Sequence, residues 1–199
     1  MERRRLDAVV VGAGSAGAAV AWQLARRGLR VAAIDRRPLE RCGARWVNGI
    51  PIWTFDEADV PRPEPPELRG EGGTFLLLGK DERGTLRLPD APPAAVDMRK
   101  LVSRLHEACR SEGVELRGRA RIRDLDLRGE RPEGLVCSVE REGGGREDLR
   151  LEADLFVDAS GMRGALRERV PALAGHCPRV PLEHSIVAVP SARYEGNED

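Results

Sequence analysis

The first residues with the spacing of a chemical site are the glycines of the segment VVVGAGSAG. Gly12, Gly14 and Gly17 stand in GxGxxG spacing, directly after an apolar run and before a helical pattern. In such a strand-turn-helix unit the first glycine permits the tight turn and the second lets a pyrophosphate approach the backbone. The third allows close packing of helix on strand, and free N–H groups at the helix start attract phosphate. The predicted binding loop consists of Gly12, Ala13, Gly14, Ser15, Ala16 and Gly17.

Asp35 follows the next apolar run and is placed to complete this site. A carboxylate at the end of the second strand of a dinucleotide-binding unit accepts hydrogen bonds from ribose hydroxyls, which argues against a 2′-phosphate there. NAD and FAD are both bound by this pattern, so the spacing leaves both dinucleotides open. A glycine-rich turn without any ligand is the remaining alternative.

The elements that must position these residues follow from apolar periodicity. Residues 6–11 and 29–34 read as buried parallel strands, and residues 15–27 read as a helix that ends at Gly28. A strand, a helix and a strand within about 30 residues make a βαβ unit, which is nearly always parallel and right-handed. The predicted buried face of the helix consists of Ala16, Val20 and Leu24.

A longer helix and several alternating segments follow. Residues 98–112 carry apolar side chains at i, i+3, i+4 and i+7, which predicts an amphipathic helix that packs on the sheet and ends at Gly113. Residues 153–157 form another apolar run ending at Asp158 and predict a further parallel strand. A three-stranded meander is expected between them, at residues 120–127, 135–140 and 147–151.

The stretch between the βαβ unit and the longer helix has a different composition. Prolines, acids and glycines fill residues 56–73, which predicts an exposed loop. Residues 74–78 and 85–88 are short apolar segments joined by a polar stretch, and they predict a hairpin outside the βαβ unit.

Composition excludes several classes of partner. The 199 residues include 33 basic and 33 acidic side chains, so no excess of charge favours nucleic acid or an anionic membrane surface. No apolar run reaches the roughly 20 residues of a spanning helix, and the charged N-terminus is unlike a signal peptide. We therefore expect a cytoplasmic protein with a small-molecule substrate, no nucleic-acid partner and no spanning membrane segment.

Cysteine and histidine spacing does not predict a metal site. His176 and His184 stand near one cysteine, but no second cluster completes a zinc shell. The cysteines form no CxxC pair; they are Cys42, Cys109, Cys137 and Cys177.

Three segments together carry a family resemblance: DAVVVGAGSAGAAVAWQLARRGLRVAAIDRR, MRKLVSRLHEACRSEGVEL and LEADLFVDASGMRGALR. With them the chain resembles the N-terminal part of FAD-dependent oxidoreductases of the aromatic hydroxylase, geranylgeranyl reductase and flavin halogenase superfamily. The resemblance implies an α/β fold: a Rossmann-like FAD-binding domain with a parallel sheet, a β-meander crossover and the beginning of a substrate-domain β-sheet.

The resemblance also implies roles for matching positions on the adenosine side of FAD. Residues 12–17 would hold the pyrophosphate, Asp35 the adenosine ribose and Arg36 the adenine side of the pocket. Ala120, on the first meander strand, would touch adenine through its backbone.

Further positions would lie near the pyrophosphate or the flavin ring. Ala159 and Gly161 would line the dinucleotide, with Asp158 as a cofactor or turn residue. Cys42 and Gly43 resemble the cysteine-glycine pair of the geranylgeranyl reductase branch, beside the isoalloxazine, although a plain buried thiol is the alternative for Cys42.

Two positions depart from the family pattern. Met98 stands where the family often has arginine, so Arg99 is an offset candidate for a flavin or phosphate contact, with a solvated helix residue as the alternative. Gly164 replaces the serine of the last motif, which weakens a nicotinamide role for that segment. Trp46 and Trp53 are candidates for shaping a substrate pocket or for packing anchors.

The expected activity is that of an oxidoreductase in which reduced, non-covalently bound FAD acts on a small organic substrate, as in monooxygenases or geranylgeranyl reductases. NAD(P)H is a possible electron donor. The alternatives are a flavin-dependent halogenase, an NAD-dependent dehydrogenase and a non-catalytic dinucleotide-binding module. No nucleophile-base pair or carboxylate dyad identifies a catalytic residue.

The expected domain organisation has four parts. Residues 1–55 form the βαβ unit with a flavin-proximal loop, and 56–94 an excursion towards a substrate domain. Residues 95–171 complete the FAD-binding domain, and 172–199 begin the substrate domain. Family members are longer and carry a later GD motif, so we expect this chain to be an N-terminal fragment.

Overall fold

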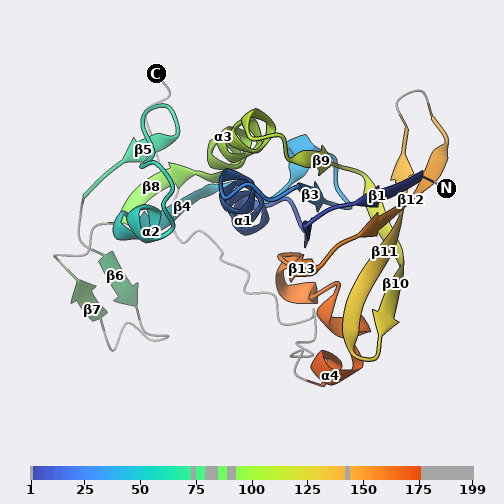
Figure 1. Cartoon of the computed structure of the whole chain (residues 1–199). Coiled ribbons are helices and arrows are strands. Elements are labelled where there is room, and N and C mark those ends of the chain that lie inside the picture. Colours follow the sequence, from blue (N-terminus) through green and yellow to red (C-terminus); the bar gives the residue numbers. More distant parts are fainter. Residues whose placement is uncertain (1, 73–74, 79–84, 89–92, 142–143, 176–199) are drawn as a thin grey trace.

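A four-stranded parallel sheet forms the centre of the protein in a computed structural model that describes residues 2–72, 75–78, 85–88, 93–141 and 144–175 (Figure 1). Its strand order is β13-β2-β3-β9, and each neighbouring pair is parallel. The predicted βαβ unit is confirmed. Its elements and partners are β2 (Ala8–Val11), α1 (Ser15–Arg26), β3 (Val31–Ile34), β9 (Glu115–Arg117) and β13 (Leu155–Asp158).

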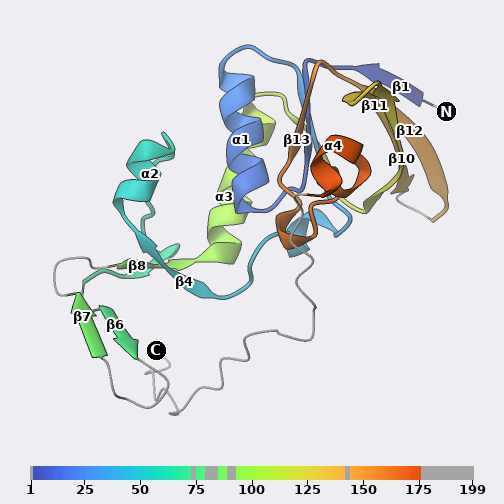
Figure 2. The same cartoon turned by 90° about the horizontal axis from the view of Figure 1, so that it is seen from below.

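Both faces of this sheet are covered, which explains its continuous apolar strands. Ala8 and Val10 belong to the core under α1 and α3 (Met98–Ser111). Val9 and Val11 belong to a second core under the meander. Because successive strand residues point to opposite faces, a strand buried on both sides needs apolar residues throughout. Figure 2 shows α1 and α3 on one side and the meander on the other.

The predicted meander forms a separate sheet of order β1-β12-β11-β10. Its three long strands are antiparallel neighbours, and the short, fully exposed β1 adds to its edge in parallel with β12. Leu135 and Leu149 are among its largest fully buried side chains. The strands are β1 (Glu2–Arg5), β10 (Ala120–Arg128), β11 (Arg131–Glu140) and β12 (Arg146–Glu152).

The predicted buried face of α1 was wrong at Ala16 and Val20, whereas Leu24 packs against the core. Ala16 is exposed, Val20 is 37% exposed and Leu24 is half-buried. The helix packs against β2, β3 and α3, and such close approach selects small side chains. Its buried residues are Gly17, Ala18, Ala21 and Ala25.

A third sheet, of order β4-β8-β5, lies beside the amino end of α3 and was not predicted (Figure 1). Prolines at the ends of β4 and β8 obscure its strand pattern. Residues 56–73, predicted to be a loop, also contribute the end of α2 and the whole of β5. The elements are β4 (Val47–Pro51), α2 (Trp53–Glu57), β5 (Leu68–Gly70) and β8 (Pro93–Asp97).

Buried carboxylates hold this third sheet against α3. Asp97 is fully buried, and it accepts hydrogen bonds from the Arg99 backbone and guanidinium and from Arg69. Hydrogen bonds from Arg99 keep the pKa of Asp97 well below its ordinary value, although burial opposes this. Glu67 is also buried and receives two bonds of 2.7 and 2.8 Å from Arg104. Charged pairs therefore join the segment that contains β5 to α3 and to the strand that precedes it.

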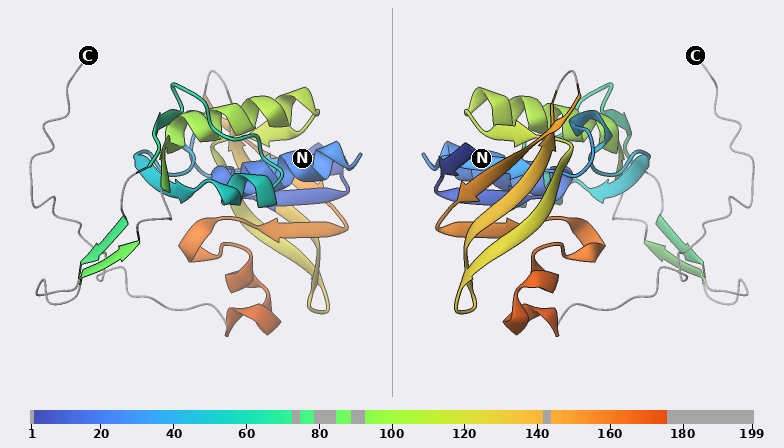
Figure 3. Two further views of the ribbon diagram at one scale, coloured as in Figure 1. Left: turned by 90° about the vertical axis from the view of Figure 1, so that its left-hand side faces the viewer. Right: turned by 90° about the vertical axis from the view of Figure 1, so that its right-hand side faces the viewer.

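The predicted hairpin is confirmed as β6 (Phe75–Leu78) paired with β7 (Thr85–Leu88). Figure 3 shows it set apart from the layered body. The expected start of a substrate domain lies almost wholly outside the described residues, which end at residue 175. Before that point the chain forms the short helices η2 (Gly161–Arg163), η3 (Arg167–Arg169) and α4 (Pro171–Ala174), while η1 (Leu39–Arg41) follows β3.

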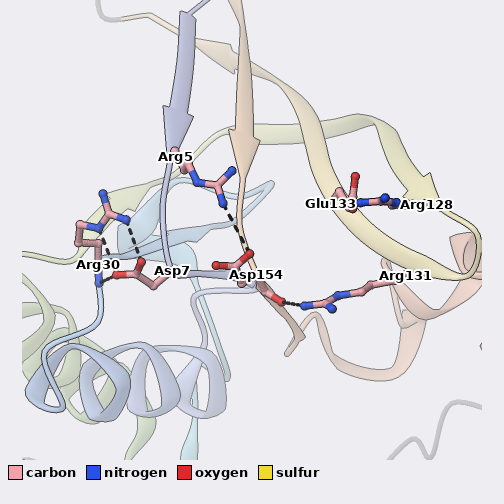
Figure 4. A network of polar contacts seen from close by, with 7 residues as sticks. All are labelled: Arg5, Asp7, Arg30, Arg128, Arg131, Glu133 and Asp154. Carbon is pink, nitrogen blue, oxygen red and sulfur yellow. Dashed lines mark hydrogen bonds and ion pairs between the residues drawn. The ribbon is translucent and has the colours of Figure 1, made fainter.

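A polar network ties the amino-terminal edge of the parallel sheet to the meander (Figure 4). Asp7 accepts three hydrogen bonds from the backbone and guanidinium of Arg30. Asp154 pairs with Arg5 at 3.8 Å, and its carbonyl accepts a bond from Arg131. Asp7 and Arg30 precede two strands of the parallel sheet, whereas Arg5 and Arg131 reach Asp154 from the meander sheet, so the polar contacts extend across the junction of the two sheets.

Candidate functional site

The glycine-rich loop, residues 12–17, joins β2 to α1 through a backbone that leaves no room for side chains at two positions. Gly12 has φ of +105°, and a Cβ there would lie 2.2 Å from the Ala159 carbonyl oxygen. A Cβ on Gly17 would lie 1.8 Å from the Gly12 carbonyl oxygen. Both contacts are with backbone, so no side-chain movement relieves them. Gly12, Gly17 and Ala159 are thus brought together as the sequence pattern predicts.

Asp35 lies beneath the same loop. Its Oδ2 accepts a 2.9 Å hydrogen bond from the Ala13 N–H, and its Oδ1 accepts one of 2.8 Å from the Arg37 N–H. The Asp35 carbonyl accepts the Ala120 N–H at 2.8 Å, which fixes the start of β10 beside the end of β3. Asp35 is only half-buried, so its carboxylate borders both the loop and solvent.

The amino end of α1 is electrostatically suited to an anion. Gly14 is its N-cap, no side chain caps the helix, and its first turn contains no acidic residue. The first N–H groups of a helix have no intrahelical acceptor, and the helix dipole adds partial positive charge there. In this turn Ser15 is half-buried and Ala16 is exposed.

Gly43 brings a second backbone segment against this helix start. It has φ of +73°, and a Cβ built on Gly14 would lie 3.2 Å from the Gly43 Cα. Its neighbour Cys42 is buried, and its Sγ donates to the Pro38 carbonyl at 3.5 Å. Burial, aided by the Asp35 carboxylate, raises the pKa of the Cys42 thiol to about 12. Cys42 is therefore protonated at neutral pH and is not a nucleophile in this state.

Asp158 organises the loop that follows β13. Its Oδ1 accepts bonds from the Ser160 backbone and hydroxyl, and its Oδ2 accepts from the backbone N–H groups of Leu166 and Arg167. Burial acts to raise the pKa of Asp158, but these bonds outweigh it and lower the pKa. The contacts match the turn role expected for Asp158. They place Ala159 beside the glycine-rich loop, while Gly161 is exposed with φ of +80°.

Two predicted cofactor contacts, Arg36 on the adenine side and Arg99 near the flavin or phosphate, stand apart from residues 12–17. Arg36 is exposed after β3. Arg99 stands at the amino end of α3, where its guanidinium binds Asp97. In the part of the chain that the structure describes, no hydrogen bond or ion pair joins either arginine to residues 12–17.

His106 was missed by the sequence analysis. It belongs to α3, is only 4% exposed, and its Nε2 lies 2.8 Å from the Ala13 carbonyl oxygen. The sequence did contain a sign of this contact. His106 falls between Val102 and Cys109 on the apolar stripe of the helix, where a buried polar side chain needs a hydrogen-bond partner. The loop is therefore contacted from α3 as well as from β3.

Other surface features lie away from the loop. Trp46 and Trp53 are 63% and 57% exposed, so neither is a packing anchor within the described residues. A hollow of about 480 Å³ opens at the amino ends of the strands of the parallel sheet, and its lining includes Arg5, Leu29 and Arg30.

No group of three or more metal-ligating side chains occurs among the residues described. None of the helices in that part of the chain has the length and apolarity to span a membrane.

Sequence comparisons identify related proteins. The family described as FAD dependent oxidoreductase matches residues 7–61. The geranylgeranyl diphosphate reductase of Rhodobacter capsulatus is 29% identical over 204 aligned residues, which cover 96% of this chain and 46% of that protein. The chain thus spans about half the length of this curated relative.

Structural comparisons show the same fold. A geranylgeranyl bacteriochlorophyll reductase-like protein from Thermoplasma acidophilum superposes with a TM-score of 0.68 at 17% identity, over 87% of this chain and 42% of the other. The myxobacterial chondrochloren halogenase, an FAD-dependent halogenase, gives a TM-score of 0.60 at 22% identity, over 80% and 38% of the two chains.

Proposed function

We propose that residues 12–17 and Asp35 bind FAD. The chain belongs to the superfamily of FAD-dependent oxidoreductases that contains geranylgeranyl reductases and flavin halogenases. The observation that carries this is the pairing of an uncapped helix start with a carboxylate beneath the same loop. The helix start suits the pyrophosphate, and the carboxylate suits the ribose hydroxyls.

The residues present fit a dinucleotide. The absence of side chains at Gly12 and Gly17 allows the tight turn and the close packing of α1 on which a pyrophosphate-binding loop depends. Ala120 is held beside Asp35 by its backbone hydrogen bond, and in the proposal it contacts the adenine, with Arg36 on the adenine side and Gly161 near the pyrophosphate. Cys42 and Gly43 follow on the flavin side, and the proposed binding is non-covalent; the buried Cys42 thiol, whose pKa is raised, is not suited to attack the flavin.

For the reaction we propose reduction of a carbon-carbon double bond in a small isoprenoid substrate. The support is the similarity to a geranylgeranyl diphosphate reductase over nearly the whole chain. When bound, FAD supplies a hydride after reduction, and NAD(P)H is the proposed donor. The protein orients the cofactor through residues 12–17 and Asp35, and the exposed Trp46 and Trp53 offer apolar surface for an isoprenoid.

Titration separates this proposal from an NAD-dependent dehydrogenase. Purified chain is titrated with FAD and, separately, with NADH, and binding is followed by fluorescence. We expect saturable FAD binding that NADH does not displace. Binding of NADH in preference to FAD would instead support a dehydrogenase.

A second assay tests the reaction. Protein loaded with FAD is reduced without oxygen, and geranylgeranyl diphosphate is then added. Reoxidation of the flavin together with a saturated product supports a reductase. Chlorination or bromination of a phenolic acceptor in the presence of halide and oxygen would support a halogenase instead.

A further inference from the structure

His106 forms the deepest polar contact with the glycine-rich loop. The residue belongs to α3 and is buried, and its Nε2 lies 2.8 Å from the Ala13 carbonyl oxygen. A carbonyl oxygen only accepts hydrogen bonds, so the proton of this contact belongs to Nε2. Burial lowers the pKa of His106 although the hydrogen bond to Ala13 opposes it, which favours the neutral ring; the contact with the carbonyl then places the one proton on Nε2.

The contact fixes one peptide group of the loop. The Ala13 carbonyl and the Gly14 N–H belong to the same trans peptide, so they point in opposite directions. With the carbonyl turned inward to His106, the Gly14 N–H is turned away from α3. Among the described residues this N–H has no protein acceptor. An open donor at the N-cap of α1 is suited to a phosphate oxygen.

Asp35 fixes the preceding peptide in the same way. Its Oδ2 accepts the Ala13 N–H at 2.9 Å, so both polar groups of Ala13 have protein partners. The Gly12 carbonyl, which belongs to the peptide of that N–H, lies against Gly17. Two consecutive peptides are thus held by side chains, one by the carboxylate that follows β3 and the other by an imidazole of α3.

We propose that His106 is a positioning residue for FAD: by holding the Ala13 carbonyl it aims the Gly14 N–H at the pyrophosphate. This inference rests on the proposed binding of FAD at residues 12–17. His106 does not touch the cofactor in this account. Its role is to limit the orientations of one peptide before the ligand arrives, which reduces the ordering cost of binding.

Two variants separate a positioning role from a packing role. His106→Leu keeps an apolar body of similar size but loses the donor. His106→Gln retains an amide N–H that can reach the same carbonyl. Cys109→Ala is the matched control, because Cys109 lies on the same buried face of α3 and its thiol donates to the Ala18 carbonyl rather than to the loop.

The dissociation constants of FAD, ADP and adenosine are measured by titration for each variant. Adenosine, the weakest of the three ligands, is titrated by NMR. We expect His106→Leu to weaken FAD and ADP about tenfold, the effect of losing one well-placed hydrogen bond, and to leave adenosine nearly unchanged. His106→Gln and Cys109→Ala should both stay close to wild type. A nitrogen-15 spectrum of the imidazole should show the proton on Nε2 in the wild type.

Each other outcome overturns the inference in a recognisable way. Unchanged ADP affinity in His106→Leu, with wild type binding FAD, refutes the positioning role and leaves the proposed function intact. Equal losses for ADP and adenosine, or a loss in His106→Gln as large as in His106→Leu, assign His106 to packing. Wild-type protein that binds neither FAD nor ADP refutes the proposed function and the inference with it.

Discussion

The carboxyl and amino ends of the parallel sheet hold their polar groups in different ways. At the carboxyl end, the loop of residues 12–17 is built from tightly approaching backbone, and the helix start after it carries no side-chain cap. At the amino end, Asp7, Arg30, Asp154 and Arg5 satisfy one another through charged side chains (Figure 4). At the carboxyl end, N–H groups of the helix start remain available to a ligand, whereas at the amino end these charged groups are paired with one another.

This difference teaches where binding and where stability reside. Open N–H groups of a helix start are suited to a ligand, since they gain a partner when it binds. Exposed ion pairs at the other end join sheets, but each contributes little because water screens it. Substitutions at the carboxyl end of the sheet should therefore change cofactor binding strongly. Substitutions at the amino end should change stability slightly and leave cofactor binding unchanged.

The largest effect is expected for Gly17→Ala. A Cβ would lie 1.8 Å from the Gly12 carbonyl oxygen, so α1 must move off the loop. We expect a loss of more than about 3 kcal/mol in the free energy of unfolding, as for severe overpacking, and no measurable FAD binding. Denaturant unfolding and FAD titration measure both.

Gly70→Ala is the matched control for this substitution, because a Cβ there meets no atom within 4 Å. It should stay within about 0.5 kcal/mol of wild type. Normal stability and normal FAD affinity in Gly17→Ala would contradict the close packing of α1 on the loop.

A smaller effect on binding is expected for Asp35→Ala. The substitution removes the acceptor of the Ala13 and Arg37 N–H groups and the proposed ribose contact. FAD affinity should fall by about 1 to 3 kcal/mol, the cost of leaving such partners unsatisfied. Asp35→Asn retains one acceptor oxygen and should lose less, and equal affinity in all three proteins would refute the ribose role.

The smallest effect is expected for Asp7→Asn, and it should depend on pH. Hydrogen bonds from Arg30 lower the pKa of Asp7 from its ordinary 3.8 to about 2. A carboxylate whose pKa is lower in the folded state stabilises the fold above its ordinary pKa, and this stabilisation is lost as pH falls towards 2. The Tm of the variant should be slightly below wild type at neutral pH, and the gap should close on acidification.

Salt provides the control for Asp7→Asn, because screening should narrow the same gap at neutral pH. FAD affinity should be unchanged, since Asp7 lies at the other end of the sheet. A marked loss of FAD binding in this variant would contradict the separation of the two ends.

Local patterns predicted more of this site than of its surroundings. Gly12, Gly17 and Asp35 were found because turn geometry and strand ends are encoded within one βαβ unit. The buried face of α1 was mispredicted, since close approach to the sheet favours small Ala21 over larger Val20. Periodicity carries no information on how near two elements will pack.

Long-range contacts account for the remaining differences. The sheet of β4, β8 and β5 depends on pairing between residues far apart in sequence, such as Leu68 with Val96. His106 gains its role only because α3 lies under the loop that contains Ala13. Asp97 similarly buries its charge against Arg69, which a reading of either segment alone does not reveal.

The visible absorption spectrum of the purified chain, recorded after incubation with FAD and desalting, tests the central claim most directly. Wild-type protein should retain flavin bands. Gly14→Val should lose them, because its side chain would stand where the pyrophosphate meets the backbone and against Gly43. A colourless wild type, or flavin retained equally by Gly14→Val, would contradict the assignment of residues 12–17 as the FAD-binding loop.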